Sequence, residues 1–138
     1  MELSSPKIEF MKKAVIATDG APAAIGPYSQ GVRSGNLIFT AGQIPLDPVT
    51  QQVVASGIED QTTQVFENLK AILEAGGSGL DRVIKATVFL KDLSDFAAMN
   101  EIYGAYLGKG GTPPARSTVE VSRLPKDVLV EIELIAEV

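Results

Sequence analysis

Apolar and polar residues alternate along two stretches near the C-terminus, at 115–121 and 128–138. Alternation with a period of two is typical of strands that bury one face. The segment 122–127, with sequence SRLPKD, favours a turn between them. We therefore predict a hairpin, in which one face of the last strand is apolar. That face carries Val128, Val130, Ile132, Leu134 and Ala136.

Four other segments of the chain also predict strands. Residues 13–17 are short and apolar, and residues 83–92 are rich in β-branched and aromatic side chains. Residues 28–33 and 37–41 flank Ser34-Gly35-Asn36, a sequence that suits a tight turn.

Two stretches have helical spacing. The first has an apolar stripe from Val65 to Leu73, and Gly76-Gly77 ends it. Ser56 and Glu59 resemble a capping box for this helix. In the second helix, which Ser94 can cap, the stripe consists of Phe96, Met99, Tyr103 and Leu107.

This order of elements predicts an α+β fold with two helices on one face of a mostly antiparallel sheet. The second face of the sheet must then meet water or another subunit. The 138 residues suffice for one domain. We assign residues 12–138 to it and residues 1–11 to an N-terminal tail, because Met11 could serve as an alternative start.

The composition excludes some kinds of catalytic side chain and disfavours some partners. With 12 Lys and Arg against 17 Asp and Glu, the net charge is −5, which makes nucleic acid a poor partner. The chain has no Cys and no His, so thiol nucleophiles and imidazole chemistry are excluded. No signal peptide or membrane span is visible, which indicates a cytoplasmic protein.

The predicted hairpin gives the polar residues of its two strands a common face. If the turn is centred on 124–125, Arg116 faces Glu133 and Thr118 faces Glu131. One interpretation is a ladder of cross-strand ion pairs. The other is a site in which Arg116 binds a carboxylate and Glu131 moves a proton, sheltered by an adjacent subunit.

Four motifs, in order along the chain, closely resemble the RidA/YjgF family of reactive intermediate deaminases. They cover most of the chain, from about residue 12 to 137. The motifs are Gly26–Gln30, Phe39–Pro48, Val88–Leu93 with Asp95-Phe96, and Pro113–Val121 followed by Arg123–Asp127 and Glu131–Glu133.

The resemblance implies a chorismate-mutase-like fold, a six-stranded sheet with two helices, and a homotrimer with active sites between subunits. It implies hydrolysis of 2-iminobutanoate and 2-iminopropanoate to 2-keto acids and ammonia. These imines come from pyridoxal-phosphate dehydratases, and the family needs no cofactor and no metal.

The resemblance also implies roles for single residues. Arg116 and the main-chain amide of Thr118 bind the substrate carboxylate, and Glu131 orients the attacking water. Many members have Cys where this chain has Thr118, which leaves substrate preference open. Three further residues would line the site: Tyr28, Phe96 and Asn100.

Without the family resemblance, the same three residues have other interpretations. Tyr28 would be a packed strand aromatic, Phe96 a core residue, and Asn100 as readily a solvated one. Two other functions also stay open. One is a ribonuclease or translation inhibitor, an activity ascribed to some members; the other is a non-enzymatic carboxylate-binding or chaperone-like protein, which would not need Glu131.

Overall fold

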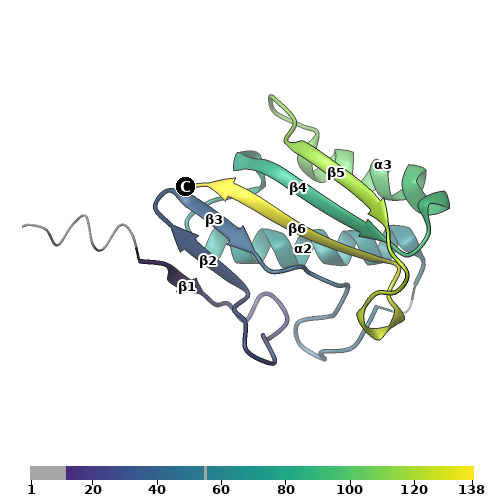
Figure 1. Cartoon of the computed structure of the whole chain (residues 1–138), viewed down its shortest axis with the longest axis horizontal. Helices are drawn as coiled ribbons and strands as arrows, with labels where there is room; N and C mark the ends of the chain where they lie inside the picture. The colour runs from purple at the N-terminus through teal and green to yellow at the C-terminus, as the bar shows by residue number, and fades with distance from the viewer. Residues whose placement is uncertain (1–11, 55) are drawn as a thin grey trace, which may run out of the picture.

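The computed structural model describes residues 12–54 and 56–138, so the predicted tail at 1–11 lies outside the described residues. One six-stranded sheet carries two α-helices, which both lie on the same side of it (Figure 1). The strands are β1 (Ala14–Ile16), β2 (Gly31–Ser34), β3 (Leu37–Thr40), β4 (Val83–Leu90), β5 (Ala115–Glu120) and β6 (Val130–Glu137). The helices are α2 (Ile58–Ala75) and α3 (Phe96–Leu107), with 3₁₀ turns η1 (Leu80–Arg82), η2 (Leu93–Asp95) and η3 (Pro125–Asp127).

The strands are ordered β1-β2-β3-β6-β4-β5 across the sheet. Strands β4 and β5 are parallel, and the other neighbours are antiparallel. The α+β fold and the mostly antiparallel sheet are therefore confirmed, as is the hairpin of β2 and β3. Gly35, in its turn, has φ +61°, a conformation that favours glycine.

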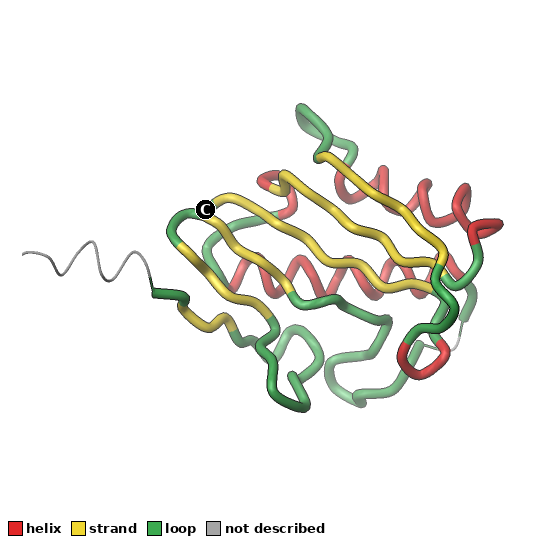
Figure 2. Tube along the Cα trace, in the orientation of Figure 1, coloured by secondary structure: helices red, strands yellow, loops and turns green. Residues whose placement is uncertain are grey.

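The predicted C-terminal hairpin is wrong, because β4 lies between β5 and β6 (Figure 2). Ala86, Val88 and Leu90 on β4 have no exposed surface, and a central strand buries them best. Helix α3 crosses over from β4 to β5, and such a crossover returns the chain as a parallel strand. The 122–127 segment is thus a connection that passes the end of β4.

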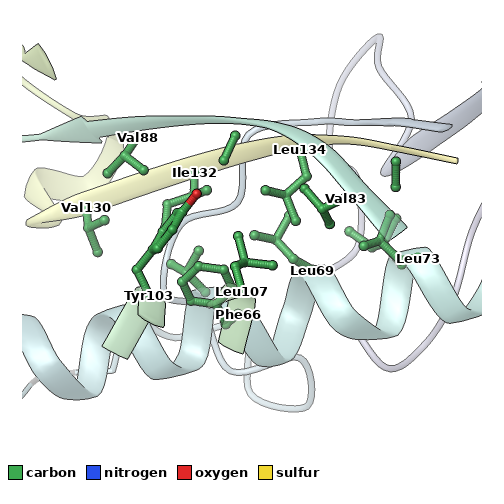
Figure 3. Close-up of a cluster of buried hydrophobic side chains, with 14 of the residues drawn as sticks. Phe66, Leu69, Leu73, Val83, Val88, Tyr103, Leu107, Val130, Ile132 and Leu134 are labelled. Carbon is green, nitrogen blue, oxygen red and sulfur yellow. The ribbon is translucent and has the colours of Figure 1, made fainter. Parts of the chain in front are cut away.

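The sheet has one face toward the helices, here called the helix face, and an opposite open face. Val130, Ile132, Leu134 and Ala136 of β6 are buried on the helix face, as predicted. They pack against Phe66, Leu69 and Leu73 of α2 and Tyr103 and Leu107 of α3 (Figure 3). The alternation in 115–121 also predicts an apolar, helix-facing side for β5, formed by Ala115, Val119 and Val121. This prediction is wrong, because no residue of β5 is fully buried and Val119 is 43% exposed on the open face.

Neither predicted helix cap forms. Helix α2 begins at Ile58 with Gly57 as its N-cap, so Ser56 lies outside the cap position. Helix α3 begins at Phe96 after η2, in which the Asp92 side chain accepts a hydrogen bond from the Ser94 amide. The end of α2 is as predicted, because the helix ends at Ala75 with Gly76 as its C-cap. A side chain at Gly76 would not fit, since its Cβ would lie 2.7 Å from the Ile38 side chain.

Candidate active site

Arg116 lies on the helix face of β5 and reaches α3. Its Nη1 donates a hydrogen bond of 2.6 Å to Asn100 Oδ1. Its guanidinium carbon lies 4.5 Å from the ring centroid of Tyr103 and 5.3 Å from that of Phe96. The structure therefore brings Arg116, Asn100 and Phe96 together.

Tyr103 was missed as a site residue, although its spacing gave a signal. Residues 96, 100 and 103 are separated by four and three positions, so they share one face of α3. The apolar stripe assigned Tyr103 to the core, and it is indeed buried. Its ring belongs to the core and to the surroundings of Arg116 at once.

The guanidinium of Arg116 keeps most of its donors available. Arginine has five N–H donors in a planar fork, and Asn100 accepts from one of the nitrogens. Within residues 12–54 and 56–138, no carboxylate lies within ion-pair distance of Arg116. The fork can therefore bind a carboxylate that comes from outside the chain.

The outer edge of β5 adds main-chain donors beside this fork. The Val121 amide donates to the Leu90 carbonyl at 2.9 Å, toward β4. Amide directions alternate along a strand, so the amides of Arg116 and Thr118 point to the opposite, free edge. The amide that the family resemblance assigns to carboxylate binding is thus directed away from the sheet.

Glu131 lies on the other side of the sheet. It pairs with Phe89, which pairs with Val119, all on the open face. By contrast, Arg116 pairs with Ala86, which pairs with Leu134, and these three residues lie on the helix face. The predicted polar patch is therefore wrong. Because β4 lies between the two strands, even-numbered residues of β5 are on the same face as even-numbered residues of β6. The sheet thus separates Glu131 and Glu133 from Arg116 and Thr118.

Glu131 lines a cavity of about 500 Å³ on that side. Its walls include Tyr28, Gly42, Gln43 and Lys126. Gln43 exchanges backbone hydrogen bonds of 2.9 and 3.1 Å with Ile132, which hold the Gly42 loop against β6. Tyr28, which is 54% exposed, lines this cavity and therefore lies with Glu131 rather than with Arg116.

A buried glutamine fixes the segment that carries Tyr28. Gln30 Nε2 donates to the carbonyls of Thr18, Ala21 and Pro22 at 2.8–3.2 Å. Its Oε1 accepts from the Thr18 amide at 2.7 Å. These bonds satisfy the main chain of the loop before Tyr28 and shape one wall of the cavity.

Sequence reasoning also missed two residues of the cavity wall. Gln51 and Lys126 have φ of 60° and 56°, values that are uncommon for residues other than glycine. Strained backbone of this kind clusters at functional sites. No motif in the sequence marked either position for a left-handed conformation.

Comparison with known proteins identifies the family. The family model described as Endoribonuclease L-PSP matches residues 18–138. The chain belongs to this family, which is also called RidA/YjgF. A RutC family protein of Pyrococcus horikoshii is 61% identical over 124 residues, which cover 90% of this chain and 97% of that protein.

Relatives within the RidA/YjgF family carry more specific names. The 2-iminobutanoate/2-iminopropanoate deaminase of Escherichia coli is 55% identical over 122 residues, 88% of this chain and 94% of the relative. The structure of E. coli TdcF with bound serine superposes with a TM-score of 0.86 at 48% identity. The superposition covers 91% of this chain and 98% of the TdcF chain.

Two structural properties of this family member bear on its site. Among the described residues, no group of three or more His, Cys, Asp or Glu side chains is placed to hold a metal ion. Neither α2 nor α3, the helices of the described part, is long and apolar enough to cross a membrane.

Burial raises the pKa of the Glu131 carboxyl, and the negative charge of Glu133 raises it further. A raised pKa means that the folded protein favours the protonated form. The stabilisation of the fold by protonated Glu131 is complete at pH values below the pKa of this group in the unfolded chain. It is lost as the pH rises through the pKa of Glu131 in the folded protein. We therefore expect Glu131→Gln to raise Tm at pH 7 and to have little effect near pH 4. Thermal unfolding across this range measures the difference, and a Tm gain that is constant with pH would contradict the assignment.

Gly42 leaves the space that the Glu131 carboxylate occupies. A Cβ on Gly42 would lie 2.9 Å from Glu131 Cδ and closer still to Oε2. Because a flexible side chain can move, we expect Gly42→Ala to displace the carboxylate, with a pKa nearer its ordinary value in an NMR titration. Gly104→Ala is the control, since nothing lies within 4 Å of its added Cβ. An unchanged Glu131 titration in Gly42→Ala would refute the close contact.

Proposed function

We propose that this protein hydrolyses 2-imino acids, 2-iminobutanoate and 2-iminopropanoate, to 2-keto acids and ammonia. The observation that carries the proposal is the fork of Arg116, which is oriented by Asn100 and has no carboxylate partner among the described residues. The activity named for the E. coli deaminase and the serine in TdcF support it, because imino acids and serine share a carboxylate next to a nitrogen-bearing carbon.

The residues suit this reaction. The Arg116 fork and the Thr118 amide bind the substrate carboxylate. Water adds to the C=N carbon, and Glu131 accepts one of its protons and passes it to the nitrogen, which gives a tetrahedral intermediate with a hydroxyl and an amino group. As the C–N bond breaks, Glu131 transfers the hydroxyl proton to the leaving nitrogen, so that the keto carbonyl forms and ammonia departs. Because the imine carbon is already electrophilic, no nucleophilic side chain is needed.

A raised pKa suits Glu131 for this role. A carboxylate with a raised pKa is a stronger base than a free carboxylate, so Glu131 takes a proton from the attacking water more readily. The cavity beside Glu131 offers space for the substrate, and Tyr28 forms part of its wall. Phe96 and Asn100 act from the other side of the sheet, around Arg116.

The proposed active site requires a second copy of the chain. Arg116 and Glu131 lie on opposite faces of one sheet, so a single chain cannot apply both to one substrate. In the proposed homotrimer, Arg116 of one subunit meets the Glu131 cavity of the next. The open face, which neither helix covers and where Phe39 and Val119 are exposed, would be buried by this assembly.

The test is a coupled reaction with a threonine dehydratase. The protein should speed the release of 2-ketobutyrate, and semicarbazide should compete by trapping the imine. If the rate of ketoacid release is the same with and without the protein, the proposal fails.

RNA cleavage, which the family description names, is the second candidate function. It predicts binding of labelled RNA at moderate salt, which the net charge of −5 disfavours. Degradation of RNA without any effect on imine hydrolysis would favour this candidate.

A further inference from the structure

Two hydroxyl groups near Arg116 have no hydrogen-bond partner within the described part of the chain. They are Tyr103 Oη and Thr118 Oγ1, and both atoms are buried. A buried hydroxyl without a partner costs free energy, so native proteins seldom retain one without a function. Tyr103 is only 7% exposed, which makes its hydroxyl costly to keep.

Both hydroxyls lie on the helix face of the sheet. Thr118 is two residues from Arg116 on β5 and pairs with the buried Val88, which pairs with Ile132. Tyr103 extends from α3 toward the sheet, with its hydroxyl oxygen at the end nearer the strands (Figure 3). Its ring lies directly beside the guanidinium of Arg116, at 4.5 Å.

Two contacts explain the position of the Tyr103 ring. It packs edge-to-face on Phe66 at 5.8 Å and supports the guanidinium by a cation–π contact. Phenylalanine would make both contacts without the buried hydroxyl. The hydroxyl therefore needs an explanation that the core does not give.

A carboxylate offers more acceptor positions than the groups already assigned to it use. Its two oxygens accept about four hydrogen bonds. The Arg116 fork, whose Nη1 already donates to Asn100, takes one position and the Thr118 amide takes another, which leaves two. Burial raises the pKa of Tyr103, so at neutral pH its hydroxyl carries the proton that it would donate.

We propose that the hydroxyls of Tyr103 and Thr118 together bind one carboxylate oxygen of the ligand that Arg116 holds. Tyr103 is then both a positioning residue for the guanidinium, through its ring, and a ligand-binding residue, through its hydroxyl. This inference rests on the proposed function only in its choice of ligand.

The test compares Tyr103→Phe, Thr118→Val and the double variant. The readouts are Tm and the Kd for 2-oxobutanoate, the keto acid product, by calorimetry. We expect each single variant to weaken binding about 5- to 10-fold, the contribution of one hydrogen bond. Tm should stay the same or rise, because an unpartnered hydroxyl is removed. Since the two hydroxyls share one oxygen, the double variant should lose less than the product of the single effects.

Tyr106→Phe is the matched control on the same helix. Tyr106 stacks on Phe66 and donates a hydrogen bond of 2.7 Å to Glu67, away from Arg116. Its removal should lower Tm and leave the Kd unchanged. Tyr103→Leu, which removes the ring, should weaken binding further than Tyr103→Phe.

Two results would overturn the inference: unchanged binding in Tyr103→Phe, or single effects that multiply fully in the double variant. Failure of the proposed function is distinguishable. A wild-type protein that binds 2-oxobutanoate but does not accelerate imine hydrolysis refutes the deaminase and leaves this inference standing. A wild-type protein that does not bind 2-oxobutanoate refutes the inference.

Discussion

Replacing Arg116 by alanine is expected to lower kcat/KM for 2-iminobutanoate by about 10- to 100-fold. The loss corresponds to one hydrogen-bonded charge pair, which contributes about 1.5–3 kcal/mol. Most of it should appear in KM, because the carboxylate is bound equally in the ground state and the transition state. The dehydratase-coupled assay measures both constants.

Lysine should not restore the activity of Arg116→Ala. An ammonium group keeps the charge, but it lacks the planar fork that donates to Asn100 and to a carboxylate at the same time. Arg82→Ala is a suitable control, because Arg82 is exposed in η1. Wild-type kinetics in Arg116→Ala would exclude Arg116 as the carboxylate anchor, and with it the deaminase mechanism.

Much of the fold follows from local patterns in the sequence. The stripe from Val65 to Leu73 and the alternation from Val130 to Ala136 are local, and the structure buries these residues as the patterns indicate. The helix caps were misjudged because Ser56 and Ser94 have suitable side chains but lie just outside the cap positions. Cap residues depend on where the first turn packs, which the local sequence does not specify.

The order of the strands could not be obtained in the same way. We expected the last two strands to pair because a turn connects them. The competing rule was available: a strand, a helix and a strand in succession usually form a parallel crossover unit. Applied to β4, α3 and β5, it would have placed β5 beside β4. The free energy that decides between the two arrangements comes from burying β4 on both edges, a long-range effect.

The wrong strand order produced the wrong placement of Arg116 relative to Glu131. In the hairpin, Arg116 and Glu131 would have shared a face and could have acted within one chain. In the structure, each has its own surroundings: Arg116 lies over aromatic rings of α3, and Glu131 lies in a cavity beside Gly42. The family motifs supplied the candidate residues, and the register, which puts Arg116 and Glu131 on opposite faces, is the reason for our proposal that two chains contribute to one site.

Combining two impaired variants in one trimer should therefore restore activity. We expect Glu131→Gln alone to reduce the rate about 10²- to 10⁴-fold, as loss of a general base does. In the proposed trimer, Arg116 comes from one subunit and Glu131 from the next. A mixed trimer of Arg116→Ala and Glu131→Gln chains then contains sites in which both residues are intact. With equal amounts and random association, about a quarter of the sites are of this kind.

The measurement is ketoacid release after the two variants are unfolded together and refolded, compared with the same variants refolded separately and then mixed. Recovery toward a quarter of the wild-type rate in the first sample alone would support a site shared between subunits. The double variant Arg116→Ala/Glu131→Gln, refolded with wild type, controls for simple dilution, because it adds no new intact pairing. If the co-refolded single variants are no faster than the separately refolded ones, each chain must use its own Arg116 and Glu131. The opposite faces of the sheet make that outcome incompatible with the mechanism proposed here, because the proton acceptor and the carboxylate anchor would then have to act across the sheet.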